Sequence, residues 1–275
     1  MSHNVWKCDR NQPEWAAKGE DCSATVRAKG MVRVYCDTLP DIIGCQEMSS
    51  VMADEIIRGL AEQGKRYALL WGRDTPILYR QSRLELLDSD FFLYPEEIPG
   101  LEGKFNNYGT KSWCIAVFRD KEDGKNLIFM TTHLWWKSSD PASINHQPGS
   151  DEARVHQLHL AINRLDAFYG KYPCPIVLAG DFNAEYPKPV VQAALRRGYT
   201  HAHDIATEFA DPDWGYHYCF GDGYKPYTNA PFEKAIDHIL VKAAAPGFVR
   251  RFERYTPAYY LPLSDHSPVF ADVVV

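Results

Sequence analysis

The feature that most restricts how this chain can fold is a series of short apolar segments that alternate with helical patterns. Each segment is rich in β-branched or apolar residues, and most are bounded by Gly, Pro, Asp or Asn. That pattern is typical of buried strands. It predicts strands at residues 41–45, 68–71, 77–79, 114–118, 127–132, 176–179 and 236–241.

The stretches between these segments contain patterns that predict helices. From Val155 to Tyr169 apolar side chains recur three and four positions apart, and Gly170 follows where a helix would end. Hairpin-like pairs at residues 79 to 92 and 114 to 130 favour sheets covered by helices over a βαβ repeat. No linker or repeat divides residues 1–275, so a single domain is predicted. We expect helices at residues 23–38, 49–63, 150–169 and 188–197.

The composition excludes several classes of protein. Hydrophobic residues make up 45% and charged residues 24% of the 275 residues, which excludes a disordered, collagen-like or coiled-coil chain. No apolar run is long enough to span a membrane, and the first residues lack the basic and apolar stretches of a signal peptide. The net charge of −6 argues against passive coating of nucleic acid, although bound divalent cations can reverse the local sign at a phosphate site.

The cysteines indicate the redox compartment. They are odd in number, widely spread and lack a C-x-x-C pair. This pattern indicates free thiols in a reducing compartment rather than a disulfide framework. We therefore expect a cytoplasmic protein, or an extracellular one if a leader has been removed. The cysteines are Cys8, Cys22, Cys36, Cys45, Cys114, Cys174 and Cys219.

Polar residues capable of chemistry share one placement, at or just after the end of a predicted buried strand. Glu47 follows the strand at residues 41–45, His133 follows the one that ends at 132, and Asp181 follows the one that ends at 179. A single acidic residue there is ordinarily a turn former or a helix cap. Several at equivalent positions are harder to explain as turns, because strand ends are where rigid scaffolds present reactive groups.

Two local patterns add chemical detail. In the Gly180-Asp181-Phe182-Asn183 stretch, the acid and the amide would share one face while Phe182 enters the core. The competing interpretation is an Asx-rich turn that leads into the next helix. Asp237 lies between apolar neighbours, and a buried carboxylate needs a partner, for which a histidine is common. His266 offers that partner.

Six motifs occur in order along the chain: Asn4, Gln46-Glu47, Thr132-His133-Leu134, Gly180-Asp181-Phe182-Asn183, Ile236-Asp237-His238-Ile239 and Ser264-Asp265-His266. Together they resemble the motif series of the endonuclease/exonuclease/phosphatase superfamily, which includes deoxyribonuclease I, apurinic endonucleases, deadenylases, inositol polyphosphate 5-phosphatases and neutral sphingomyelinases. The match extends from Asn4 to Pro268. The resemblance implies an α+β fold, a four-layer α/β/β/α sandwich in which two mixed β-sheets pack face to face with helices outside, as in deoxyribonuclease I.

The resemblance also implies a site for one or two Mg²⁺ or Mn²⁺ ions. Glu47 would be the principal ligand, and Asn4 and Asp265 would complete or flank the site. Their oxygens are the hard ligands that Mg²⁺ prefers. Family members usually have a full strand before the first Asn, whereas only Met1-Ser2-His3 precede Asn4 here. The first strand is therefore expected to be truncated or to begin before Met1.

Catalytic roles follow from the same resemblance. Asp181 would orient or deprotonate the attacking water, and Asn183 would hydrogen-bond a phosphate oxygen. His266, held by Asp237, would contact the scissile phosphate, and His133 would add a second phosphate contact or help to protonate the leaving group. In-line attack builds negative charge on the phosphate and leaving oxygens, which a metal and an imidazolium would stabilise.

Residues near these motifs are candidate substrate contacts. Tyr108 and Lys111 precede a predicted strand in a stretch that lies near the cleft in this family. Trp135 and Trp136 follow His133 directly. An exposed ring there could stack on a base, whereas a buried one would pack against the sheet. We expect one of the pair to pack and assign the substrate contact to Trp135.

The sequence therefore predicts a divalent-metal-dependent phosphoesterase, foremost a phosphodiesterase or nuclease-like hydrolase. Three alternatives stay open: a phosphomonoesterase, a lipid phosphoesterase of the inositol phosphate or sphingomyelin type, and a non-catalytic binding module on the same fold. The lack of an apolar hairpin suited to docking on a bilayer argues against the lipid version. The expected partner is a phosphoester substrate, with nucleic acid among the candidates, and we expect a monomer without a membrane span.

Overall fold

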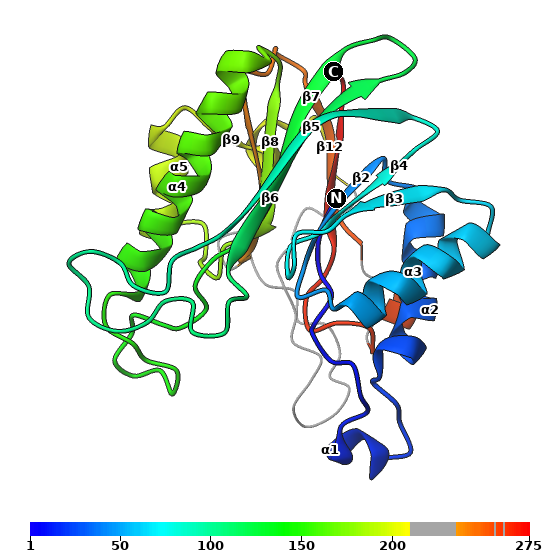
Figure 1. Cartoon of the computed structure of the whole chain (residues 1–275), viewed down its shortest axis with the longest axis vertical. Helices are drawn as coiled ribbons and strands as arrows, with labels where there is room; N and C mark the ends of the chain where they lie inside the picture. Colours follow the sequence, from blue (N-terminus) through cyan, green and yellow to red (C-terminus); the bar gives the residue numbers. More distant parts are fainter. Residues whose placement is uncertain (210–234, 256, 261) are drawn as a thin grey trace.

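Two mixed β-sheets packed face to face form the centre of the molecule (Figure 1). The computed structural model describes residues 1–209, 235–255, 257–260 and 262–275. Within these residues, seven strands form one sheet, in the order β10 (Glu208–Phe209), β12 (Val249–Arg254), β13 (Val269–Val273), β1 (Ser2–Asn4), β2 (Ile42–Gln46), β4 (Ile77–Arg80) and β3 (Tyr67–Leu70). Six strands form the other, in the order β5 (Leu84–Leu93), β6 (Ser112–Asp120), β7 (Asn126–His133), β8 (Ile176–Asp181), β11 (Asp237–Lys242) and β9 (Thr200–His201).

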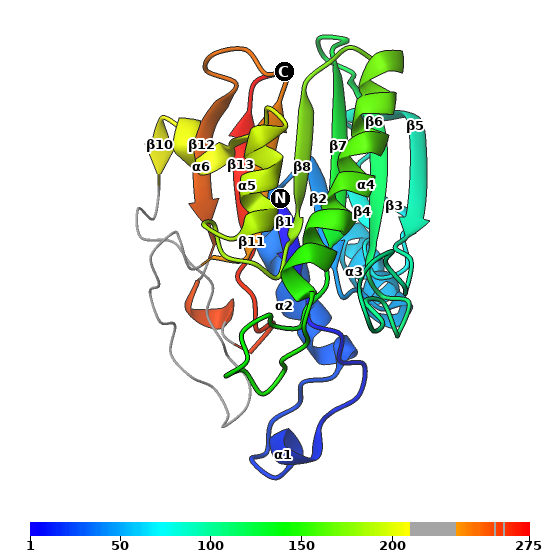
Figure 2. The same cartoon turned by 90° about the vertical axis from the view of Figure 1, so that its left-hand side faces the viewer.

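Helices cover the outer face of each sheet (Figure 2). Helices α2 (Ala24–Thr38) and α3 (Ser50–Glu62) pack on the seven-stranded sheet, and α4 (Ser150–Lys171) and α5 (Pro189–Arg196) pack on the six-stranded sheet. A third apolar cluster fills the space between the two sheets. The predicted four-layer α/β/β/α sandwich is confirmed. Two short helices, α1 (Pro13–Ala16) and α6 (Ala202–Ile205), follow β1 and β9 in the sequence.

The apolar runs in the central strands follow from burial on both faces. In β7, Ile128 and Met130 point outward to the cluster under α4, while Leu127 and Phe129 point into the space between the sheets. Successive side chains of a strand alternate between faces. A strand covered on both sides therefore needs an apolar residue at nearly every position, which is the pattern that the sequence shows.

Two glycines allow close approach near one end of the sandwich. A Cβ on Gly44 would lie 2.6 Å from the Cβ of Thr131 in the facing sheet. A Cβ on Gly180 would lie 2.0 Å from the carbonyl oxygen of Thr132, and its φ of +150° is one that side chains rarely adopt. Side chains at these positions would force the backbones apart. The glycines therefore set the spacing of β2, β7 and β8 where those strands end.

Most predicted elements are present. All seven predicted strands are found, with ends that differ by no more than two residues, and the four predicted helices correspond to α2, α3, α4 and α5. Ser49 caps α3 by accepting a hydrogen bond from the Met52 N–H. Gly170 does not end α4, which continues to Lys171. The first strand, β1, is only three residues long.

One predicted hairpin is wrong. Strand β4 pairs with β2 and β3, whereas β5 pairs with β6, so residues 79 and 92 lie in different sheets. The chain crosses between the sheets in the short turn after Arg80. The hairpin predicted at residues 114 to 130 is confirmed by the antiparallel pairing of β6 with β7.

Two further predictions concern membranes and thiols. No helix in the described part of the chain is long and apolar enough to cross a membrane. Six cysteines are free thiols, and Cys219 lies outside the described residues.

Candidate active site

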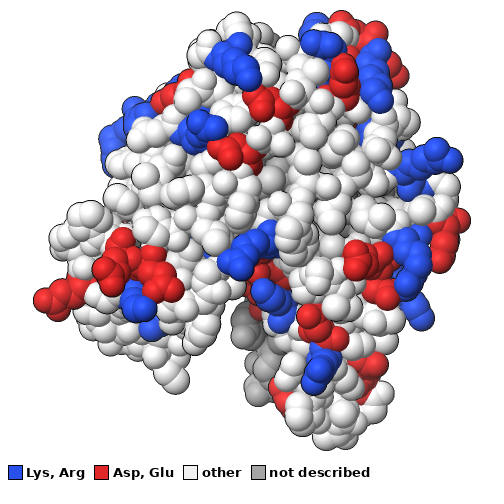
Figure 3. All heavy atoms as spheres, viewed as in Figure 1, with Lys and Arg blue, Asp and Glu red and all other residues white. Residues whose placement is uncertain are grey.

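The polar residues that the sequence singled out meet at one end of the sandwich, the lower end in Figure 1. Parallel strands β1 and β2 bring Asn4 beside Gln46, so Glu47 follows at the same edge. In the other sheet, His133 pairs with Asp181 across parallel β7 and β8, and Asp181 pairs with Asp237 across β8 and β11. The sheets face each other, so these side chains converge. The molecular face in Figure 3 is hollowed at this end, where basic and acidic side chains gather.

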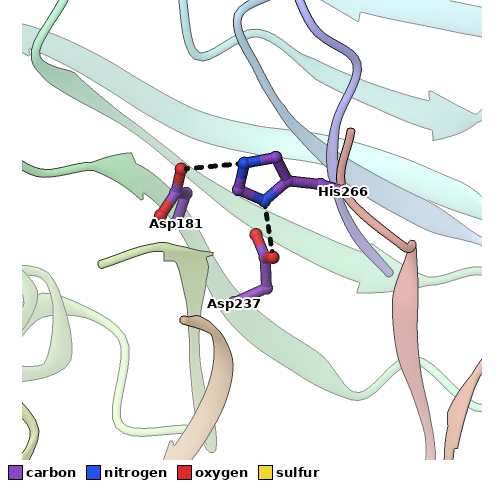
Figure 4. A group of neighbouring side chains, drawn as sticks. All are labelled: Asp181, Asp237 and His266. Atoms are coloured by element: carbon purple, nitrogen blue, oxygen red, sulfur yellow. Dashed lines mark hydrogen bonds and ion pairs between the residues drawn. The ribbon is translucent and has the colours of Figure 1, made fainter. Parts of the chain in front are cut away.

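His266 lies between two buried carboxylates (Figure 4). Its Nδ1 is 2.8 Å from Asp237 Oδ2, and its Nε2 is 3.9 Å from Asp181 Oδ2. Asp181 and Asp237 are 1% and 2% exposed, so neither charge is well solvated. A buried carboxylate beside an imidazole favours the protonated ring. The arrangement points Nε2 of the His266 ring towards Asp181.

Burial and mutual charge shift the acidities of this group. Burial alone would lower the pKa of His266, but the hydrogen bond and charge of Asp237 raise it well above its ordinary value. Burial also raises the pKa of Asp237, although His266 opposes that shift. For Asp181, burial opposes ionisation, but the influence of His266, His133 and Lys111 outweighs it and holds the pKa of Asp181 below the ordinary range. The group therefore presents a charged imidazole and an ionised carboxylate to the same space.

Glu47 and Asn4 face this space from the other sheet. Asn4 Nδ2 donates to Asp181 Oδ2 at 3.0 Å and to Glu47 Oε1 at 3.3 Å. Glu47 Oε2 accepts from the backbone N–H of Lys7 at 3.2 Å. Glu47 has a φ of +58°, and Asn183, which follows β8, has a φ of +50°. Such left-handed conformations are costly in residues with side chains and tend to cluster at functional sites.

A second imidazole–carboxylate arrangement lies on the far side of Asp181. His133 Nε2 is 3.5 Å from Asp181 Oδ2, and His133 Nδ1 is 3.5 Å from Asp74 Oδ2. Asp74 is 3% exposed and also pairs with Lys7 Nζ at 3.0 Å. Burial opposes the ionisation of Asp74, but the His133 and Lys7 contacts outweigh it and lower its pKa. Lys111 Nζ contacts His133 Nε2, so a cation lies beside the ring.

Asp74 was missed by the sequence analysis, although the signal was present. It comes four residues after the end of β3, in the loop that begins with Trp71. That is the placement, after a buried strand, by which Glu47 and Asp181 were recognised. Its role depends on contact with His133 from another sheet, which the local pattern does not contain.

The donor set fits a divalent cation. Burial, together with repulsion from Glu47 and Asp181, raises the pKa of Asp265 to about 6. His266 opposes that shift, and the carboxylates of Asp265, Glu47 and Asp181 offer hard oxygens, which are suitable ligands for Mg²⁺. Ligand atoms of Asp181, Asp237 and His266 also lie within 4.8 Å of one another. Because His266 holds a proton against Asp237, that group is better suited to contact a phosphate than a metal.

Comparison with known proteins identifies the family. A model of the endonuclease/exonuclease/phosphatase family matches residues 1–266. The chain belongs to this family. The family is hydrolytic. No curated protein sequence matches this chain.

Solved structures of the endonuclease/exonuclease/phosphatase family share the fold. A mannosyl-6-phosphatase from Bacteroides thetaiotaomicron superimposes with a TM-score of 0.75 at 20% identity, with coverage of 100% of this chain and 98% of that one. TDP2 from D. rerio, solved with a single-strand DNA product, gives 0.63 at 19% identity, with coverage of 98% and 96%. The human Nocturnin catalytic domain, solved with a sulfate anion, gives 0.56 at 18% identity, with coverage of 89% and 87%.

The remaining candidate residues occupy different environments. The Asn183 side chain donates to the Leu134 carbonyl at 3.1 Å, and its backbone N–H donates to Asp181 Oδ1 at 2.8 Å. Lys111 is 4% exposed, beside His133, and burial lowers its pKa. Tyr108 is 77% exposed.

Of the two tryptophans, the one to which the sequence assigned a substrate contact, Trp135, is the buried one. Trp135 is 1% exposed and packs edge-on against Phe105, whereas Trp136 is 39% exposed. Gln157 fixes this turn by accepting from the Trp135 N–H at 2.8 Å, and Arg154 donates to the Trp135 carbonyl at 3.0 Å. Trp135 is therefore the packed member of the pair, and Trp136 is the exposed one.

Proposed function

We propose that this protein is a divalent-metal-dependent phosphoester hydrolase in which a water molecule attacks phosphorus directly. The observation that carries the proposal is the convergence of His266, Asp237 and Asp181 with Glu47 and Asn4 across the gap between the two sheets. An ionised carboxylate, a charged imidazole and hard oxygen ligands are the groups that such a reaction requires. Membership of a hydrolytic family supports the same conclusion.

Asp181 is the group that acts on water. Its pKa is held below the ordinary range by His266, His133 and Lys111, although burial opposes this. It is therefore ionised at neutral pH and accepts a hydrogen bond from the attacking water, which orients the oxygen lone pair. His266 provides the opposite charge, because its protonated ring can donate from Nε2 to a phosphate oxygen as negative charge develops there.

His133, supported by Asp74, serves the leaving group. Its Nδ1 faces Asp74 and its Nε2 faces the site, next to Lys111. An alkoxide leaving group needs a proton, which Lys111 Nζ is placed to donate, and His133 Nε2 orients that ammonium by accepting from it. Asp74 holds the ring in that orientation.

Glu47 and Asp265 would hold Mg²⁺ or Mn²⁺, and Asn4 Nδ2, which donates to Glu47 Oε1, would keep that carboxylate in place. When bound, the cation would neutralise the excess of carboxylates and polarise a phosphate oxygen. Nothing in the role of Asp181, His266 or His133 depends on the number of ions.

For the substrate class, a phosphodiester is our first candidate, because TDP2, solved with a single-strand DNA product, shares the fold over 98% of this chain. A phosphomonoester is the second candidate, because the mannosyl-6-phosphatase shares the fold over the full length of this chain. The net charge of −6 argues for a small substrate rather than a long polyanion.

A substrate panel tests the proposal. The protein should hydrolyse bis-p-nitrophenyl phosphate faster than p-nitrophenyl phosphate, and plasmid DNA and RNA should be assayed in parallel. Every activity should disappear with EDTA and return with Mg²⁺ or Mn²⁺. Hydrolysis that survives EDTA would contradict the metal requirement, and a preference for the monoester would select the second candidate.

A further inference from the structure

We propose that Tyr260 and His3, which are fully buried behind the site, are positioning residues that hold the backbone of His266 in place for catalysis. The inference rests on the proposed function, since it assigns His266 a role in hydrolysis. It is carried by a buried chain of hydrogen bonds behind the site. Tyr260 O–H donates to the His266 carbonyl oxygen at 2.6 Å, and His3 Nε2 lies 2.6 Å from the same hydroxyl.

The direction of this chain is set by the number of protons available. A carbonyl can only accept, so the single hydroxyl proton of Tyr260 is used on His266. The Tyr260 oxygen must therefore accept from His3 Nε2–H. His3 is fully buried between the hydroxyls of Tyr35 and Tyr260, a setting that favours the neutral ring with its one proton on Nε2. His3 Nδ1 then accepts from the Tyr35 hydroxyl at 2.8 Å.

The surroundings make this chain rigid. His3, Tyr35 and Tyr260 are all 0% exposed, and the two tyrosines belong to the apolar cluster under α2 and α3. The His3 ring packs against both tyrosine rings, with centroids 5.7 and 5.8 Å away. Tyr260 closes the short η2 helix (Ala258–Tyr260). A polar ring in such a core is costly unless it is fully hydrogen-bonded. Both ring nitrogens of His3 are hydrogen-bonded here, and the proton on Nε2 orients the Tyr260 hydroxyl.

A second connection from β1 reaches the same loop. The Ser264 hydroxyl donates to the Asn4 carbonyl at 2.7 Å, and the His266 N–H donates to the Ser264 oxygen at 3.2 Å. The backbone of residue 266 is thus fixed at its N–H through Asn4 and at its C=O through His3. Strand β1 therefore places the His266 ring relative to Asp181 as well as supplying Asn4 to the site.

The position of His266 matters because two distances depend on it. Its ring lies 2.8 Å from Asp237 and 3.9 Å from Asp181. A displacement of about 1 Å in a catalytic group can cost roughly a hundredfold in rate. Tyr260→Phe removes one of the two backbone hydrogen bonds of His266 described above, so it should move the loop by less than about 1 Å. We therefore expect kcat to fall roughly tenfold with little change in KM.

The matched control is Tyr67→Phe. Tyr67 is a buried tyrosine of the same apolar cluster, and its hydroxyl donates to the backbone carbonyl of Pro40. It lies on β3, at the edge of the seven-stranded sheet and remote from His266. Both variants lose the same hydrogen bond type, so loss of stability alone should affect them similarly. We expect wild-type kcat for Tyr67→Phe within about twofold, a limit set by the precision of comparing turnover numbers.

The decisive measurement repeats Tyr260→Phe in a His266→Ala background. If Tyr260 acts through His266, it should cost nothing further there, because residues that act as one unit are not additive. An undiminished loss in that background, or equal kcat for Tyr260→Phe and Tyr67→Phe, would overturn the proposal.

A readout independent of turnover separates this proposal from the proposed function. In ¹⁵N spectra of histidine side chains, the His266 Nδ1–H proton should be protected from solvent exchange in the wild type and in Tyr67→Phe. It should exchange faster in Tyr260→Phe. Should the wild type hydrolyse no phosphoester, the proposed function fails while this spectrum still decides the positioning role. Unchanged exchange in Tyr260→Phe would refute it.

Discussion

His238 should make the fold sensitive to acid. Its ring is buried on the face of β11 opposite Asp237, where Nε2 donates to the Ala184 carbonyl at 2.8 Å and Nδ1 lies 3.1 Å from His201 Nε2. The carbonyl can only accept, so Nε2 carries the proton and Nδ1 accepts from His201. A second proton on Nδ1 would oppose the His201 N–H. Burial, partly offset by the Ala184 hydrogen bond and Asp181, lowers the pKa of His238 to about 4.

The size and sign of the effect follow from that pKa. In the unfolded chain the ring should titrate near its ordinary value of 6.5. Between pH 6.5 and 4 the unfolded state therefore binds one more proton than the folded state. Stability is intact above pH 6.5 and falls as the pH drops, by about 1.4 kcal/mol per pH unit. Between pH 7.5 and 5.0 the loss from this residue is about 2 kcal/mol.

The comparison that isolates this loss is with His238→Gln, which removes the titrating ring. Urea unfolding at pH 7.5, 6.0 and 5.0 gives the free energy of unfolding of each protein, and each is referred to its own value at pH 7.5. The wild type should lose about 2 kcal/mol more than His238→Gln by pH 5.0. Equal losses would refute the reasoning, because they would mean that the folded protein accepts a proton on His238 as readily as the unfolded chain.

Three further predictions concern the site and its scaffold. Asp237→Asn and His266→Ala should each lower kcat/KM on the order of a hundredfold or more, and the double variant should be little worse than the weaker single; independent, additive losses in kcat/KM would contradict the pairing. Asp74→Asn should slow hydrolysis of an alkyl phosphodiester roughly a hundredfold but that of a p-nitrophenyl ester much less, because p-nitrophenolate leaves without a proton. The ratio of kcat/KM for the two esters measures this difference, and equal slowing of both would exclude the leaving-group role. Gly180→Ala should destabilise the fold by about 3 kcal/mol or more in urea unfolding, because its Cβ would meet the Thr132 carbonyl; a change below about 1 kcal/mol would contradict the close approach.

Much of this architecture could be predicted from local pattern. Burial on both faces makes each central strand an uninterrupted apolar run, so its end, and the polar residue after it, is marked in the sequence. Glu47, His133 and Asp181 were identified in that way. The pairing of Asp237 with His266 followed from the need of a buried carboxylate for a partner. Its distance of 2.8 Å agrees with that argument.

The rest depends on contacts that no local pattern contains. Asp74 gains its role from its contact with His133 of the other sheet. The chain crosses from one sheet to the other between β4 and β5, and this crossing is visible only once the pairing partners of both strands are known. Trp135 and Trp136 have identical chemistry, and only packing against Phe105 decides which of them is buried.

The most direct test of the central claim is the turnover of bis-p-nitrophenyl phosphate by Glu47→Ala in the presence of Mg²⁺. Glu62, an exposed residue at the end of α3, supplies the control variant Glu62→Ala. Glu47 lies at a strand end rather than in the core, so both variants should fold, as circular dichroism would verify. A metal-dependent hydrolase built on Glu47 predicts loss of activity in Glu47→Ala on the order of a hundredfold or more and full activity in Glu62→Ala. Wild-type turnover by Glu47→Ala would contradict the account.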